Sequence, residues 1–147
     1  MILPNEILLE EVARLLDEGR EVELLTKGSS MLPFIVGDRD SVILTKDGCG
    51  SVVPGDIVLA RRSVGVYILH RIVEVNGTSV VLRGDGNISG REMIRRQDII
   101  GRVIRVVHPS GRGYVPGKAR FWRNTGPLFR RVVLAVYRRT ILKIITR

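Results

Sequence analysis

The sequence has few of the residues that build disulfides, metal centres and stacked nucleic-acid surfaces. Its 147 residues include a single cysteine, Cys49, so neither an intrachain disulfide nor a cysteine-based metal site can form. Aromatic residues make up only 5%. The hydrophobic fraction of 44% is still enough for a folded core, which excludes a disordered chain. We expect no metal and no other cofactor.

Long apolar runs are missing as well. No uncharged apolar stretch approaches the roughly 18 residues that span a bilayer. The opening residues, "MILPNEILLEEVARLLDEG", lack the basic start of a signal peptide and carry acidic residues throughout. We therefore expect a cytoplasmic chain that does not cross a membrane by itself, and that is peripheral to the membrane only if one of its surfaces binds lipid.

Acidic residues are absent from the end of the chain. Residues 118–147 hold nine Lys or Arg and no Asp or Glu, whereas residues 1–117 hold 15 residues of each sign. The net charge of +9 therefore belongs entirely to this tail. The chain is a neutral domain with a basic extension rather than a basic domain.

The tail is predicted to form a basic amphipathic helix. Pro127 suits a first helical position, and the apolar residues after it recur at helical spacing. Such a helix fits an anionic membrane surface, although packing against its own domain is an equal alternative. Nucleic-acid binding is not expected, because the aromatic residues of the tail show no stacking pattern. The apolar face is expected to hold Val133, Leu134, Tyr137, Ile141, Ile144 and Ile145.

The rest of the chain predicts a mainly β domain with a helix in front. Apolar residues at helical spacing mark a helix over about residues 5–18, with Asn5 as its cap. Short β-branched runs then alternate with Gly, Pro, Asn and Asp, and Asn76-Gly77 is a hairpin signal. This pattern favours a coiled antiparallel β domain. The expected boundaries are 1–117 for the domain, 21–108 for its β core, 108–118 for a linker and 118–147 for the helical extension.

A turn rich in small residues, "KGSSMLPFIVGDRD", holds two adjacent serines. A serine hydroxyl is a weak nucleophile until a base takes its proton. The candidate bases are His70, His108, Lys27 and Lys46. Taken alone, a serine in a turn or a histidine in a strand is more often structural than catalytic.

Four blocks change this interpretation when they are considered together. They are "GSSMLPFIVGD", "PGDIVLARR", "LHRIVEV" and "LRGDGN", in this order over roughly residues 22–108. The order resembles the signal peptidase and SOS-repressor clan of serine peptidases. In that clan the nucleophile is the serine directly before a Met, which implies Ser30. Histidine-type members place Arg-Ile after the base, which implies His70, so "LHRI" matches the histidine kind rather than the lysine kind.

The resemblance implies a signal peptidase-like β fold that hydrolyses a peptide bond in an extended peptide or precursor protein. Ser30 would attack the carbonyl and His70 would accept its proton. Asp85 is expected to orient the imidazole, with Glu92 as the alternative, while the backbone N–H of Ser30 stabilises the oxyanion. The other motif residues would support the nucleophile loop (Gly28, Ser29 and Met31) or the fold (Pro33, Gly37, Asp38, Gly55, Asp56, Arg71, Gly84 and Asn87).

The chain departs from the membrane enzymes of the clan at the nucleophile. Those enzymes carry Ser-Gly-Ser-Met, whereas this chain has Gly28, Ser29, Ser30 and Met31. The side-chain oxyanion donor two residues before the nucleophile is therefore missing, as in the soluble repressor peptidases. Two other hypotheses stay open: a peptidase-like domain that binds a peptide segment without turnover, and a domain that acts on nucleic acid or a membrane through its basic tail.

Overall fold

A computed structural model describes residues 6–141 of the chain, and it opens with helix α1 (Glu6–Asp17). This helix confirms the predicted one, although the expected cap Asn5 lies outside the described residues. The helix ends at Asp17, and Gly19 in the turn after it donates its N–H to the carbonyl of Leu16 at 3.0 Å. Gly19 has a φ of 85°, the left-handed conformation that commonly terminates a helix.

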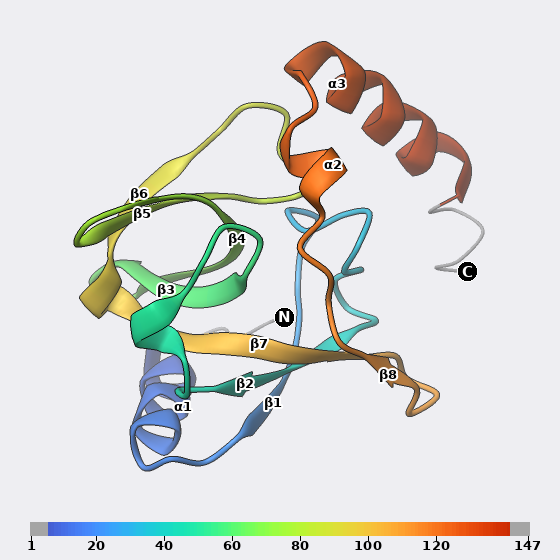
Figure 1. The fold of residues 1–147 in the computed structure, drawn as a ribbon. Coiled ribbons are helices and arrows are strands. Elements are labelled where there is room, and N and C mark those ends of the chain that lie inside the picture. The colour runs from blue at the N-terminus through green and yellow to red at the C-terminus, as the bar shows by residue number, and fades with distance from the viewer. Residues whose placement is uncertain (1–5, 142–147) are drawn as a thin grey trace.

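Eight strands follow in one antiparallel sheet, which confirms the predicted mainly β architecture (Figure 1). The strand order is β1-β2-β7-β3-β4-β5-β6, and β8 pairs with β7. Strand β1 therefore lies at one edge of the sheet and β6 at the other. The strands are β1 (Val22–Leu25), β2 (Ser41–Thr45), β3 (Ile57–Ser63), β4 (Val66–Asn76), β5 (Ser79–Arg83), β6 (Glu92–Arg95), β7 (Ile99–Val107) and β8 (Gly113–Tyr114).

The hairpin predicted at Asn76-Gly77 joins β4 to β5, and Asn76 lies opposite Ser79. Gly77 takes a φ of 56°, as a tight hairpin turn requires. Two strands were not predicted. Strand β6 has four residues. Strand β8 has two, and it lies within the stretch expected to be a linker. Strands this short have too few residues to show a period-two pattern, and their neighbours in the sheet specify them.

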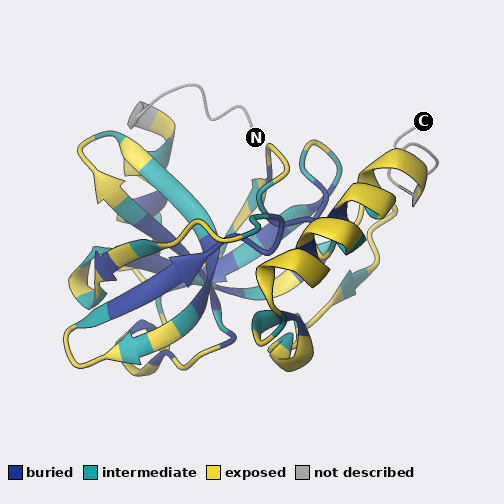
Figure 2. Cartoon of the chain, turned by 90° about the horizontal axis from the view of Figure 1, so that it is seen from above, coloured by how far each residue is buried: buried dark blue, intermediate teal, exposed yellow. Residues whose placement is uncertain are grey.

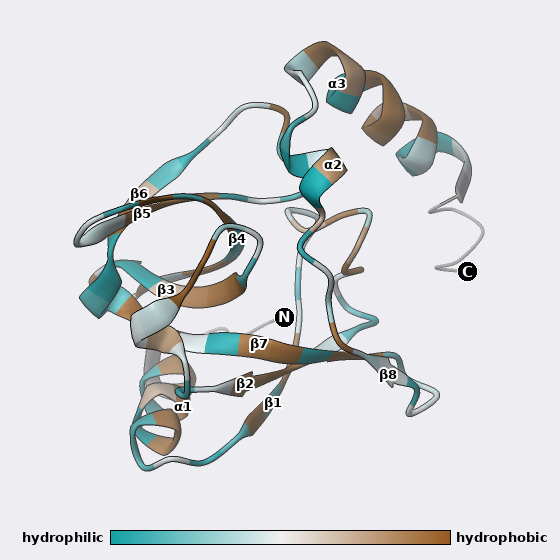
Figure 3. Cartoon of the chain, viewed as in Figure 1, coloured by the Kyte–Doolittle hydropathy of each residue, from teal (hydrophilic) through white to brown (hydrophobic). Residues whose placement is uncertain are grey.

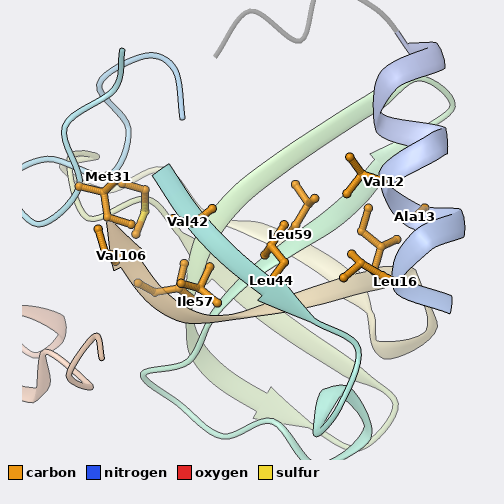
Figure 4. Packing of buried hydrophobic residues seen from close by; sticks show 12 residues of the cluster. Val12, Ala13, Leu16, Met31, Val42, Leu44, Ile57, Leu59 and Val106 are labelled. Atoms are coloured by element: carbon orange, nitrogen blue, oxygen red, sulfur yellow. The ribbon is translucent and has the colours of Figure 1, made fainter. Parts of the chain in front are cut away.

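The core lies on both faces of strand β3. Ile57 and Leu59 belong to a cluster beneath α1, whereas Val58 and Ala60 belong to a second cluster on the other face. Figure 4 shows Val12, Ala13 and Leu16 of α1 turned toward the strands that carry Leu44 and Leu59. The second cluster also contains Cys49, Val52, Ile72, Val80, Leu82, Ile94 and Ile99.

Helix α1 approaches the sheet closely at Gly101 of β7. A Cβ at this position would lie 2.8 Å from Leu16 Cδ1, so any larger residue would require the Leu16 side chain to shift. The helix thereby fixes the first cluster, which reaches Met31 in the serine loop.

The C-terminal extension contains helices α2 (Arg120–Arg123) and α3 (Pro127–Val136), followed by a π-helical turn η3 (Tyr137–Ile141). Helix α3 begins at Pro127, as predicted. Two short 3-10 turns, η1 (Cys49–Ser51) and η2 (Arg96–Asp98), lie within the β domain. Within residues 6–141, no helix is both long enough and apolar enough to cross a lipid bilayer.

Where the structure describes it, the apolar face predicted for the tail packs against its own domain, which is the alternative left open above. Leu134 is buried, and Val133 and Tyr137 are half-buried, so this side is turned toward the protein. The side chains of Ile141, Ile144 and Ile145 lie outside the described residues. Figure 2 shows that the opposite side of α3 is exposed along its length.

Candidate active site

The loop between β1 and β2, residues 26–40, holds the two serines and is closed at its base. Thr26 donates its N–H and its Oγ1 hydroxyl to the carbonyl of Asp40, at 3.0 and 2.7 Å. Gly37 packs directly on Gly28, because a Cβ at Gly37 would lie 2.0 Å from the Gly28 carbonyl oxygen. Gly28 itself has a φ of 81°. Both predicted loop glycines are therefore required by the backbone geometry.

Inside this loop a single helical turn positions Ser30. The N–H of Ile35 donates to the carbonyl of Met31 at 3.0 Å, and both side chains are buried in the first core cluster. The Leu32–Pro33 peptide bond in this turn is cis. Ser30 is half-buried at the start of the turn, whereas Ser29 is exposed. The core contacts of the turn therefore fix the serine that precedes Met31.

The buried acid of the loop is Asp40, which sequence reasoning missed. Its carboxylate accepts the N–H of Val36 at 2.9 Å and pairs with Arg39 at 2.8 Å. Asp38, the acid of the predicted motif, instead has a φ of 64° and pairs with Lys27 at 3.2 Å near the surface. The only signal for Asp40 in the sequence is its position directly before a strand.

His70 lies in the middle of β4 and is 8% exposed. Its Nδ1 contacts Oε1 of Glu92, the first residue of β6. Its Nε2 faces Gly84, where a Cβ would lie 3.1 Å away. The carboxylate on His70 is thus that of Glu92, the alternative given above, and not that of Asp85, which was the first choice.

Asp85 is instead paired with Arg71 on the other side of the strand. Arg71 Nε and Nη2 each lie 2.8 Å from a carboxylate oxygen of Asp85. Successive residues of a strand point to opposite faces, so Arg71 and His70 reach different carboxylates. The Nη1 of Arg71 donates to the carbonyls of Gly55 and Gly117, both at 2.8 Å.

The loop after β5, residues 84–87, lies against the serine loop, residues 26–40. The N–H of Gly86 donates to the carbonyl of Ser30 at 2.7 Å. A Cβ on Gly84 would lie 2.4 Å from the same carbonyl oxygen, so a side chain there would push the two loops apart. The N–H of Asn87 closes the turn on the Gly84 carbonyl at 2.9 Å. Gly84 therefore brings the Ser30 backbone and the Nε2 side of His70 to one place.

Ser30 and His70 line one pocket of about 260 Å³. Its walls come from α1, from the end of β1 and the residues after it, and from β3 and β4. Strand β1 has no partner on its outer side within the described chain. An extended peptide could therefore add to this edge and reach the serine. The apolar wall consists of Leu9, Leu24, Leu25, Met31, Ile35, Leu59, Tyr67, Ile68 and Leu69.

The other candidate bases have partners of their own. Lys27 also lines the pocket, but it pairs with Asp38 at 3.2 Å. Lys46 pairs with Asp17 at 3.5 Å and donates to a backbone carbonyl. His108 lies in the β7–β8 turn and contacts Ser110.

Burial raises the pKa of the Cys49 thiol. Among the residues that the structure describes, no three His, Cys, Asp or Glu side chains gather in a way that could hold a metal ion.

The C-terminal extension is anchored on the 84–87 loop by a buried arginine. Arg130 is 1% exposed and donates to the carbonyls of Asp85, Asn87 and Trp122, at 3.1, 2.7 and 2.9 Å. Its guanidinium also stacks 4.8 Å from the centre of the Trp122 ring, whose Nε1 donates to the same Asp85 carbonyl at 2.9 Å. Burial lowers the pKa of Arg130 to about 10, so the group stays charged at neutral pH.

The second Gly-Asp motif also contacts the extension. The Asp56 carboxylate binds Lys118 Nζ. Gly55 has a φ of 103°, and a Cβ there would lie 2.6 Å from Lys118 Cβ. The boundary expected between residues 117 and 118 therefore falls inside a set of close contacts.

Comparison with protein-family models, with curated proteins and with solved structures finds no match. The likeness to the signal peptidase and SOS-repressor clan therefore rests on the four sequence blocks.

The clamp at Arg130 leads to a prediction about stability. Arg130→Gln removes the donors to three buried carbonyls and should lower the free energy of unfolding by about 2–4 kcal/mol. Hydrogen exchange at the Gly86 amide should accelerate as the 84–87 loop loosens. Arg131→Gln is the matched control, because Arg131 is exposed, and should change stability by less than about 0.5 kcal/mol. Equal unfolding temperatures for the two variants would contradict the clamp.

Proposed function

We propose that the protein is a serine endopeptidase that cleaves an extended peptide or precursor by a Ser–His mechanism. The observation that supports this most strongly is the placement of His70. One ring nitrogen is held by Glu92, while the other faces the loop that contacts Ser30. A histidine oriented in this way by a carboxylate is the arrangement that a general base requires.

The proposed reaction follows from these groups. Ser30 Oγ attacks the peptide carbonyl while its proton passes to Nε2 of His70. The tetrahedral oxyanion is stabilised by the Ser30 N–H, and its collapse breaks the C–N bond as His70 protonates the leaving amine. Water, deprotonated by His70, then hydrolyses the acyl-enzyme and restores the serine. Glu92 holds the Nδ1–H tautomer and stabilises the imidazolium.

The pocket supports a substrate bound in extended form. Strand β1 offers main-chain hydrogen bonds along its outer edge, and the apolar wall beside Ser30 offers a site for apolar side chains. A domain that binds such a segment without turnover is the second candidate. It is favoured by Gly28, which supplies no side-chain oxyanion donor. Covalent labelling distinguishes the two candidates.

Labelling should identify Ser30 as the nucleophile. A serine-directed phosphonate should phosphonylate the wild-type chain at Ser30, detected by peptide mass spectrometry. Ser30→Ala should abolish both labelling and peptide cleavage, whereas Ser29→Ala should retain most of each, because Ser29 is exposed and does not line the pocket. Equal labelling of the Ser30→Ala protein would refute the assignment. A wild-type protein that binds peptide but is never labelled would favour the second candidate.

Substitution of Glu92 should lower activity, whereas substitution of Asp85 should lower stability. Glu92→Gln keeps the shape of the side chain but removes the charge that holds His70, so kcat should fall by about 10²–10⁴-fold while the unfolding temperature stays close to wild type. Asp85→Asn leaves Arg71 as a buried, poorly compensated charge and should cost about 3–5 kcal/mol of stability. A Glu92→Gln protein with full activity would show that Glu92 does not orient the base.

A further inference from the structure

Helix α3 carries large apolar side chains on its outer side, while its buried side includes an arginine. Its buried side holds Arg130, 1% exposed, next to Leu134 at 2%. Its outer side holds Leu128, Val132 and Val136, which are 76, 55 and 53% exposed. Their spacing of four residues places the three on one face. An outer face made of large apolar side chains is the mark of an interaction surface.

Two phenylalanines extend this apolar face. Phe121 of α2 is 75% exposed and Phe129 is 49% exposed, and their rings meet edge to face at 6.2 Å. Figure 2 shows the exposed length of α3, and Figure 3 shows hydrophobic residues along the same helix. The apolar face therefore continues across two helices.

Positive charge surrounds the apolar face, and no acid offsets it. Arg120, Arg131, Arg138 and Arg139 are exposed on these elements, and residues 118–147 contain no Asp or Glu. An anionic lipid surface offers an apolar layer beneath negative head groups, which matches both features. The apolar residues lie on the outside of a helix and need no complementary groove.

We propose that this outer face of α3, with Phe121, binds an anionic membrane surface. The proposal does not depend on peptidase activity. The inward side of α3 is engaged with the 84–87 loop, so the helix stays docked on the domain while its outer face meets lipid. Binding combines partial burial of the apolar face with attraction between the arginines and the head groups.

The test uses the full chain and vesicles of phosphatidylcholine with and without phosphatidylserine. We expect co-sedimentation with the anionic vesicles only, weakening as salt rises because surface charges are screened over roughly 8–10 Å at physiological ionic strength. Leu128→Ser/Val132→Ser should weaken binding by about 10-fold or more. Arg131→Gln/Arg139→Gln should weaken it by about 5-fold per charge.

The matched control is Val64→Ser/Val115→Ser, which removes two side chains that are 92 and 73% exposed at other places on the surface. It should bind vesicles like the wild type. All variants change exposed side chains, so their unfolding temperatures should stay near that of the wild type. The proposal is wrong if the wild type ignores anionic vesicles at low salt, or if Leu128→Ser/Val132→Ser binds as well as the control. It is also wrong if the wild type self-associates through this face and leaves the vesicles unbound.

Discussion

The buried ion pair between Arg71 and Asp85 is the interaction on which the rest of the site depends. Arg71 is 1% exposed and Asp85 is 3% exposed, so both charges have lost nearly all of their water. Such a pair is tolerated only when its remaining hydrogen-bonding groups are satisfied. Arg71 meets this requirement through two backbone carbonyls, from Gly55 and Gly117, and by stacking 5.4 Å from the ring centre of Phe34.

These partners come from four separate segments of the chain. Phe34 belongs to the serine loop, Gly55 to the second Gly-Asp motif, Asp85 to the loop after β5, and Gly117 to the segment just before the extension. One side chain therefore holds together the blocks that the sequence shows in order but far apart. The same strand turns His70 to its opposite face, so the ion pair and the candidate base are positioned together by β4.

The sequence predicted the elements whose pattern is local. Helix α1, the β-branched strands and the Asn76-Gly77 hairpin each carry their signal within a few residues. For the partner of His70 the sequence favoured Asp85 over the alternative Glu92, because neighbouring motif residues do not show which face of a strand each one serves. Glu92 lies at the start of a four-residue strand, two strands away from β4 in the sheet. Only the sheet order brings it to His70, and no periodicity in the sequence records that order.

The orientation of the C-terminal helix α3 could likewise not be predicted in full from the sequence. The charge of the tail and its helix start at Pro127 could be predicted, but hydropathy alone assigns arginine to solvent and Leu or Val to the interior. Arg130 is buried because three carbonyls from Trp122, Asp85 and Asn87 converge on its guanidinium. Once this contact sets the rotation of α3, the face that carries Leu128 and Val132 must point outward.

The 84–87 loop is consequently held from two sides. From one side, Gly86 donates its N–H to Ser30 at 2.7 Å, and from the other, its carbonyl accepts from Arg138 of η3 at 3.2 Å. Arg130 donates to the carbonyls of Asp85 and Asn87, which flank Gly86, and Trp122 also donates to that of Asp85. A displacement of α3 would therefore act on the same short loop that fixes the Ser30 backbone. Because packed interiors transmit strain, such a displacement would reach the serine loop through the 84–87 loop.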